Sequence, residues 1–175
     1  MIIPLLSITI LFCALALLCI LTIIDLRHYL LPNIYVFPFG ILGFLFHFTN
    51  NFDFLPLAQT LLGCGLGYGI LYLIRLGGNY YYKQESLGLG DVKLLAAAGL
   101  WLGAEGVMIA MTAGAFAGLL HGLFIAAMHT IIKKQKFNIS RLKIPAGPGF
   151  IVGIIMAFVW LYGQDIQSIW YNLIL

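Results

Sequence analysis

The chain of 175 residues is 62% apolar and carries only nine Lys or Arg and six Asp or Glu. A soluble domain has about a quarter of its residues charged, so the composition excludes a soluble protein and indicates a membrane protein. A net charge of +3 without a dense basic face also argues against a nucleic-acid partner. Cys13, Cys19 and Cys64 lie in apolar runs without a Cys-x-x-Cys pair. We therefore expect no metal site and interpret them as buried apolar side chains.

The first apolar run, residues 2–24, has no charged residue and is long enough to cross a hydrocarbon core of about 30 Å. It lacks a basic segment before it and a small-residue cleavage site, so we expect a retained membrane helix rather than a signal peptide. Further apolar runs follow at residues 34–48, 54–74, 92–103, 107–132 and 144–163. Pro38 interrupts the second run, and the fourth would rise only about 18 Å, so it is either extended by its neighbours or a half-helix. The tail, residues 166–175, is too short to cross and suits an interfacial anchor.

The basic residues fall on one side of a six-span arrangement. Arg27 follows the first span, Arg75, Lys83 and Lys93 flank the connection from the third to the fourth, and the other five lie between the fifth and sixth. The opposite side, which includes the predicted turns at 50–53 and 104–106, has no Lys or Arg. Because positive residues stay in the cytoplasm, we expect an all-α bundle of six transmembrane helices in one domain, residues 1–175, with both termini outside, in the periplasm. Glycines spaced by four predict close helix packing at Gly63/Gly67, Gly65/Gly69, Gly99/Gly103 and Gly114/Gly118/Gly122.

Two carboxylates lie at membrane depth, where ionisable residues indicate functional sites. Asp25 follows the first apolar run and Asp91 begins the fourth, and two crossings between them return the chain to the same membrane face. Two carboxylates in one site share a proton, so one can take a proton from water while the other donates a hydrogen bond to a peptide carbonyl. The pattern therefore permits hydrolysis of an amide. Gly88 and Gly90 would let a substrate strand approach closely.

Simpler roles exist for the same residues. Asp91 could be a helix N-cap, and Asp25 could be the interfacial end of a helix beside Arg27. Lys93 could tune the charge of Asp91, bind the scissile carbonyl or extend to the interface. A second candidate function is a small transporter that uses the two aspartates as a proton or cation relay. A third, a purely structural membrane subunit, leaves both aspartates unexplained.

Three motifs resemble those of the type IV prepilin peptidase family, membrane-embedded aspartyl proteases with a Gly-x-Gly-Asp signature. Asp25 followed by Leu31-Pro32-Asn33 looks like the family's Asp followed by a Leu/Ile-Pro-Asp/Asn turn. Residues 88–95, Gly-Leu-Gly-Asp-Val-Lys-Leu-Leu, are very similar to the family's Gly-x-Gly-Asp-x-Lys-Leu. Pro-Ala-Gly-Pro at 145–148 resembles the Pro-x-Gly-Pro turn before the last span. The three motifs occur in the family's order and cover most of the chain.

The resemblance implies a catalytic pair, Asp25 and Asp91, and a set of supporting or substrate-binding residues: Gly88, Gly90, Lys93, Pro32, Asn33, Gly147 and Pro148. It implies removal of the short basic leader from type IV pilin-like or pseudopilin precursors, without a cofactor, at the cytoplasmic face of the bacterial inner membrane. Many bacterial members carry an additional N-terminal segment with two Cys-x-x-Cys pairs and also N-methylate the new N-terminus. This chain lacks those cysteines, so we expect a compact peptidase without the methyltransferase activity.

Overall fold

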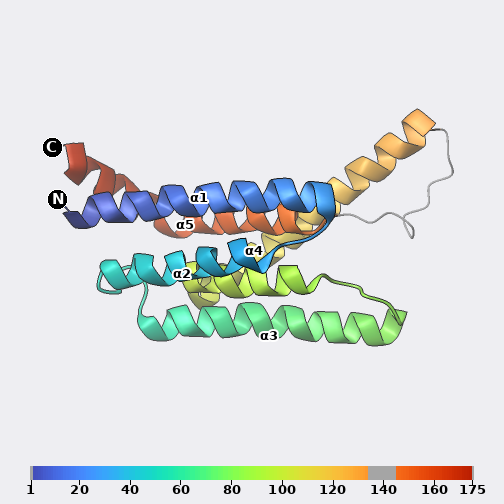
Figure 1. The fold of residues 1–175 in the computed structure, drawn as a ribbon, viewed down its shortest axis with the longest axis horizontal. Coiled ribbons are helices and arrows are strands. Elements are labelled where there is room, and N and C mark those ends of the chain that lie inside the picture. The colour runs from blue at the N-terminus through green and yellow to red at the C-terminus, as the bar shows by residue number, and fades with distance from the viewer. Residues whose placement is uncertain (1, 134–144, 175) are drawn as a thin grey trace.

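The computed structural model describes residues 2–133 and 145–174, and all regular structure in these ranges is α-helical (Figure 1). The helices are α1 (Ile2–His28), α2 (Asn33–Thr49), α3 (Leu57–Tyr82), α4 (Leu89–Lys133) and α5 (Gly147–Ile174). The prediction of an all-α chain is therefore confirmed for these residues. Most of the basic segment predicted before the last span lies outside the described residues, including Lys134, Lys136, Arg141 and Lys143.

Three helical stretches are long and apolar enough to cross a membrane: Leu5–His28, Leu57–Tyr82 and Leu89–Ile125. Asn33–Thr49 and Gly147–Gly163 are shorter apolar helices. Pro38 lies inside α2 without ending it. The predicted tail is not a separate segment, because α5 continues as one helix to Ile174.

The long helix α4 reverses its direction at Gly103. This residue has φ 66° and ψ −171°, which are not helical angles, and its positive φ is a conformation that glycine adopts readily. Residues 104–106 are helical, so the prediction of a separate turn at these residues is wrong. A single glycine makes the reversal, and it divides α4 into a first part, residues 89–102, and a second part, residues 104–133.

The contacts of α4 define the direction of its two parts. A Cβ atom built on Gly67 would overlap Leu95, and one on Gly63 would overlap Gly99 and Gly103, so the first part is antiparallel to α3. The corresponding contacts of Gly106 with Leu161 and of Gly114 with Phe150 make the second part antiparallel to α5. Figure 1 shows both chain termini at one end of the bundle and the α1–α2 and α3–α4 connections at the other.

Glycine seams join α3 to α4 and α4 to α5. A side chain on Gly99 would overlap the backbone of Gly63 and Cys64, and one on Gly149 would overlap the backbone of Gly114 and Gly118. The predicted close packing is confirmed at these positions. It is wrong for the pair Gly65/Gly69, because a Cβ on either residue would have nothing within 4 Å.

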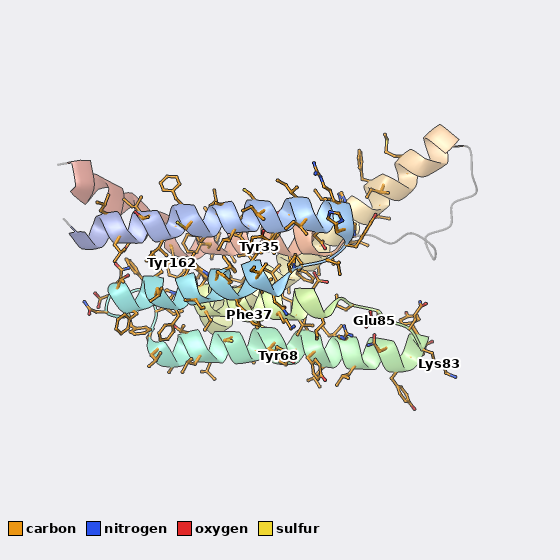
Figure 2. All side chains as sticks on the ribbon, viewed as in Figure 1. Tyr35, Phe37, Tyr68, Lys83, Glu85 and Tyr162 are labelled. Carbon is orange, nitrogen blue, oxygen red and sulfur yellow. The ribbon has the colours of Figure 1, made fainter. Side chains whose placement is uncertain are left out.

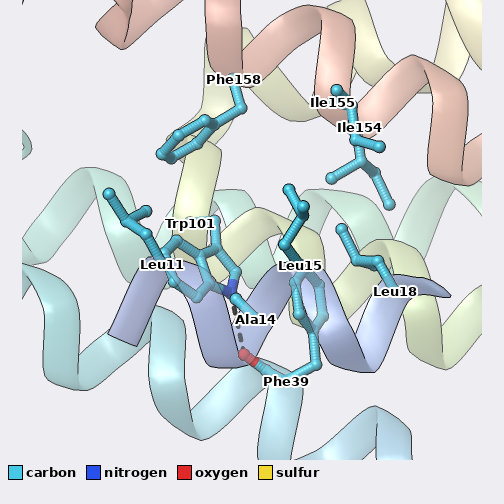
Figure 3. Close-up of a pocket in the computed structure, with 9 residues that line it drawn as sticks. All are labelled: Leu11, Ala14, Leu15, Leu18, Phe39, Trp101, Ile154, Ile155 and Phe158. Carbon is cyan, nitrogen blue, oxygen red and sulfur yellow. Dashed lines mark hydrogen bonds between the residues drawn. The ribbon is translucent and has the colours of Figure 1, made fainter. Parts of the chain in front are cut away.

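Aromatic residues of α2 hold the C-terminal end of the first part of α4, near Trp101. Trp101 Nε1–H donates to the Phe39 carbonyl at 2.8 Å, beside an apolar cavity of about 110 Å³ between α1, α2, α4 and α5 (Figure 3). His47, fully buried, donates from Nε2 to the Trp101 carbonyl at 2.9 Å. The irregular backbone at Gly103 interrupts the regular helical hydrogen bonds beside this carbonyl, so His47 supports the reversal.

The cysteines differ from the prediction that all three are buried. Cys13 and Cys19 are exposed on α1, and Cys64 on α3 is intermediate. A membrane protein presents apolar side chains to lipid as well as to its core, so an apolar sequence neighbourhood does not identify a buried residue. The prediction is therefore wrong for the two α1 cysteines.

Candidate active site

Asp25 lies in the last turns of α1 and caps the start of α5. Its side chain is 5% exposed, and its Oδ2 accepts a hydrogen bond from the Gly147 N–H at 3.0 Å. Gly147 is the first residue of α5, so its N–H has no partner within the helix. A carboxylate at this position also interacts favourably with the positive end of the helix dipole. The third predicted motif therefore contacts the first one directly.

Only a residue without a side chain fits at position 147. A Cβ atom built on Gly147 would lie 2.6 Å from Oδ2 and 3.0 Å from Cγ of Asp25. These separations are shorter than van der Waals contact, so an alanine would have to displace the carboxylate or the start of α5. Gly147 thus provides both a hydrogen-bond donor and the room for its acceptor.

Asp91 lies in the first turn of α4 and is 7% exposed. It is the third residue of the helix rather than the N-cap, and its carboxylate accepts a hydrogen bond from the backbone N–H of Gly88. Its Oδ1 is buried without a hydrogen-bond partner among the described residues. One oxygen of this carboxylate is therefore fixed by the preceding loop, and the other remains available as an acceptor.

The two aspartates share one site. Although 66 residues separate them in the sequence, their carboxyl groups are close enough for direct charge repulsion. Gly90 packs against the connection between α1 and α2, because a Cβ built on it would lie 2.8 Å from the Leu31 Cβ. Leu31, part of the first motif, is thus a positioning contact that sequence reasoning did not single out.

Lys93 and Asn33 form a second link between the first two motifs. Lys93 Nζ donates to Asn33 Oδ1 at 3.1 Å, which joins the start of α2 to the start of α4. Residues two apart in a helix do not face the same side, so Lys93 is directed to α2 on a different side of α4 from Asp91. The carbonyl of Pro32 accepts from the N–H groups of Tyr35 and Val36 and begins α2.

Pro148 follows Gly147 in the first turn of α5. Its fixed φ angle suits the beginning of a helix. Pro32 and Pro148 therefore shape the starts of two helices. The carboxylate of Asp25 contacts Gly147, and the carboxylate of Asp91 contacts Gly88. The catalytic or supporting role of each residue remains a prediction.

Arg75 is an organising residue that sequence reasoning counted only for membrane orientation. It donates from Nη1 to the Leu87 carbonyl at 2.8 Å and from Nη2 to Glu85 Oε1 at 2.9 Å. Figure 2 shows Glu85 and Lys83 where α3 gives way to the loop. The Glu85 side chain is 81% exposed, so this ion pair contributes little by itself. The bond to Leu87 holds the segment that leads into Gly88 and Asp91. Arg75 lies inside α3, which continues to Tyr82, whereas the apolar run that predicted this helix ends at residue 74, so the sequence did not indicate this role.

Comparison with known proteins identifies the family. Residues 10–123 match the model of the type IV leader peptidase family. The chain belongs to this family. The matched range includes both aspartates and the Asn33–Lys93 link, whereas Gly147 lies beyond it. The resemblance seen in the motifs is therefore confirmed.

Several relatives of this family member are named prepilin leader peptidase/N-methyltransferase. The protein of Dickeya chrysanthemi is 35% identical over 112 residues, which cover 64% of this chain and 39% of the relative. That of Xanthomonas campestris pv. campestris is 32% identical over 143 residues, 82% of this chain and 46% of the relative. That of Aeromonas salmonicida is 29% identical over 151 residues, 86% of this chain and 48% of the relative. The matched regions thus span less than half of these relatives, and no solved structure matches the chain.

Proposed function

We propose that this chain is a membrane aspartyl endopeptidase that removes the short basic leader from type IV pilin-like or pseudopilin precursors. The observation that carries the proposal is the shared site of Asp25 and Asp91, two buried carboxyl groups that interact although they come from distant parts of the sequence. Membership of the type IV leader peptidase family supports this class of substrate. The proposal covers the peptidase reaction alone, since the matched region spans less than half of each relative described above.

The two carboxyl groups would act on one water molecule. In this mechanism, one carboxylate takes a proton from water as the water oxygen attacks the scissile carbonyl carbon. The other group, protonated, donates a hydrogen bond to the carbonyl oxygen. The tetrahedral intermediate then collapses, the C–N bond breaks, and a proton passes to the leaving amine. The products are a leader with a new carboxylate and a mature protein with a new amino group.

The surroundings of the carboxyl groups suit these roles. The Gly147 N–H fixes Oδ2 of Asp25, and the free Oδ1 of Asp91 offers an acceptor for water within the same site. Two carboxyl groups that repel each other favour the state with one shared proton, which supplies one base and one acid together. Groups that are held in place before the reaction lose little entropy on reaching the transition state.

The proposal includes a location for the site. Six helical segments would cross the bacterial inner membrane, with both termini in the periplasm and the aspartates at the cytoplasmic end. Arg27 and Lys83 lie near the α1–α2 and α3–α4 connections, and positive residues near membrane helices stay in the cytoplasm. A basic leader is retained on the same face, which brings the scissile bond to the aspartates.

Co-expression with a precursor tests the proposal. The chain and an epitope-tagged type IV pilin-like precursor are produced together in a bacterium, and leader removal is followed by immunoblot. We expect cleavage by the wild type and none by Asp25→Asn or Asp91→Asn. Asp53→Asn is the matched control, because it makes the same chemical change at an exposed residue in the α2–α3 connection, and we expect it to cleave normally.

Other outcomes would replace the proposal. Full cleavage by either aspartate variant, at wild-type protein levels, would exclude the paired-aspartate mechanism. The transporter hypothesis predicts instead that purified protein in liposomes carries protons or cations in an Asp25- and Asp91-dependent way without any cleavage. The flux assay and the immunoblot therefore separate the two functions.

A further inference from the structure

We propose, on the basis of the proposed function, that Arg75 is a positioning residue for Asp91 and that it acts through a single peptide group. The Arg75 guanidinium donates from Nη1 to the Leu87 carbonyl at 2.8 Å. The N–H of the same peptide group belongs to Gly88 and donates to the Asp91 carboxylate. Two consecutive hydrogen bonds thus connect a basic side chain of α3 to a candidate catalytic carboxylate of α4.

The peptide group between Leu87 and Gly88 has the polarity that this connection needs. Peptide groups are planar and almost always trans, so the C=O and the N–H point in opposite directions. The Arg75 cation lies at the oxygen end of the group, and the Asp91 carboxylate lies at the N–H end. Both charged groups therefore stabilise the same orientation of the peptide. Hydrogen bonds in such a chain strengthen one another, and a charged partner makes each bond stronger than a neutral one.

The surroundings of Arg75 favour its bond to the peptide. Only 15% of the Arg75 side chain is exposed, so water competes little for its N–H groups. Its other acceptor, Glu85 Oε1, binds Nη2 at 2.9 Å, and the planar guanidinium group holds its donors in a fixed relation to one another. The bond from Nη2 to Glu85 therefore helps to direct Nη1 toward the Leu87 carbonyl.

Fixing one oxygen of the Asp91 carboxylate sets the direction of the other. A Cβ atom built on Gly88 would lie 2.9 Å from Asp91 Oδ2, so this oxygen lies against Gly88. Oδ1 is buried and has no hydrogen-bond partner within the part of the chain that the structure describes. In the proposed reaction, Oδ1 accepts a hydrogen bond from the attacking water. Arg75 would orient this oxygen before the reaction, and groups that are oriented in advance lower the entropic cost of the transition state.

The loop before α4 has a second attachment to α3 that does not involve Arg75. Asn79 lies one helical turn after Arg75 on the same face of α3, and its Oδ1 accepts from the Ser86 N–H at 2.8 Å and from Ser86 Oγ at 3.1 Å. A Cβ atom on Gly78 would overlap Ser86, so the loop lies directly against α3 at this point. Loss of the Arg75 side chain should therefore release the peptide that follows Leu87 and leave the loop attached.

Steady-state cleavage of purified precursor in detergent tests the role of Arg75. Arg75→Met removes the charge and the donors, and we expect kcat to fall about tenfold to about 100-fold, with KM within about twofold of the wild type. Arg75→Lys keeps a charged donor on a shorter side chain, and we expect it to recover about a third of the wild-type kcat. Lys83→Met is the matched control, because it removes the same charge from an exposed residue at the end of α3 (Figure 2), and we expect its kcat to be unchanged.

A double-mutant cycle shows whether Arg75 acts through the peptide between Leu87 and Gly88. Gly88→Ala places a Cβ atom against Asp91 Oδ2 and disturbs the same hydrogen bond from its other end. If both changes act on this one bond, their effects on kcat should not add, and the double variant should be little slower than the slower single one. Asn79→Ala weakens the attachment at Ser86 instead, and we expect a smaller loss of kcat than for Arg75→Met.

Three results would overturn the role of Arg75. A folded Arg75→Met protein with the wild-type kcat would show that Asp91 does not need this connection. Equal losses of kcat in Arg75→Met and Asn79→Ala would show that attachment of the loop alone matters. A rise in KM without a fall in kcat would place Arg75 in substrate binding. If Arg75→Met does not fold, Arg75→Gln, which is polar but too short to reach the Leu87 carbonyl, takes its place with the same expectation.

The outcomes separate this inference from the proposed function. Cleavage that depends on both aspartates, combined with a wild-type rate for the Arg75 variants, would refute the role of Arg75 and leave the peptidase intact. No cleavage by the wild type would refute the peptidase, and the role of Arg75 with it.

Discussion

Replacing Gly147 with alanine tests how the third motif supports the site. The added Cβ would lie 2.6 Å from Asp25 Oδ2. The carboxylate must therefore move away from the Gly147 N–H, from which its Oδ2 accepts a hydrogen bond at 3.0 Å. A hydrogen bond to a charged group contributes about 1.5–3 kcal/mol. If the transition state depends on this bond, its loss lowers kcat by about tenfold to about 150-fold.

The assay is a single-turnover cleavage of purified precursor in detergent, with the thermal unfolding of each variant measured in parallel. Gly69→Ala is the matched control, because a Cβ on Gly69 would meet nothing within 4 Å. We expect the control to cleave at the wild-type rate. A folded Gly147→Ala protein with wild-type kcat would refute the reasoning, since the carboxylate would then not need this donor.

Three further substitutions test the links that hold the site and the reversal of α4. Gly99→Ala would overlap the backbone of α3 and should lower the free energy of unfolding by about 3 kcal/mol. Gly65→Ala, at an open position, should leave the free energy of unfolding unchanged. Equal melting temperatures of the two variants would refute the close packing of α3 on α4 at Gly99. His47→Leu removes the donor to the Trp101 carbonyl and should destabilise the protein by about 1–3 kcal/mol, with less loss for His47→Gln, which keeps a donor; a neutral His47→Leu would contradict its role. Asn33→Ala and Lys93→Met should couple by about 1 kcal/mol in a double-mutant cycle on kcat, because the two side chains share one hydrogen bond; strictly additive losses would show that this bond does not support the site.

The sequence was sufficient to predict the helical class and the two aspartates because both depend on local patterns. Charge-free apolar runs indicate helices wherever they occur, and a carboxylate beside such a run is unusual enough to be noticed. Asp25 and Asp91 could also be expected to meet, because two helices between them return the chain to the same end. That argument uses only the number of crossings and needs no side-chain detail.

The sequence could not predict contacts that depend on how the helices rotate and approach. The hydrogen bond from Gly147 to Asp25 joins residues 122 apart, and no spacing rule connects them. The sequence predicts a turn at 104–106 between two apolar runs, whereas the structure reverses the chain at Gly103, which has a positive φ. Gly65 and Gly69 have the same spacing as Gly63 and Gly67 but face open space, because the period alone does not say which helix face meets a neighbour.

The most direct test of the central claim is whether Asp25 and Asp91 act as one unit. Single-turnover rates would be measured for Asp25→Asn, Asp91→Asn and the double variant, all at equal folded concentration, with Asp53→Asn as the control. Residues that act together on one water give effects that do not add. The account predicts that each single variant loses essentially all cleavage and that the double variant is no slower than either one. Substantial residual cleavage by the single variants, with losses that multiply in the double variant, would contradict it.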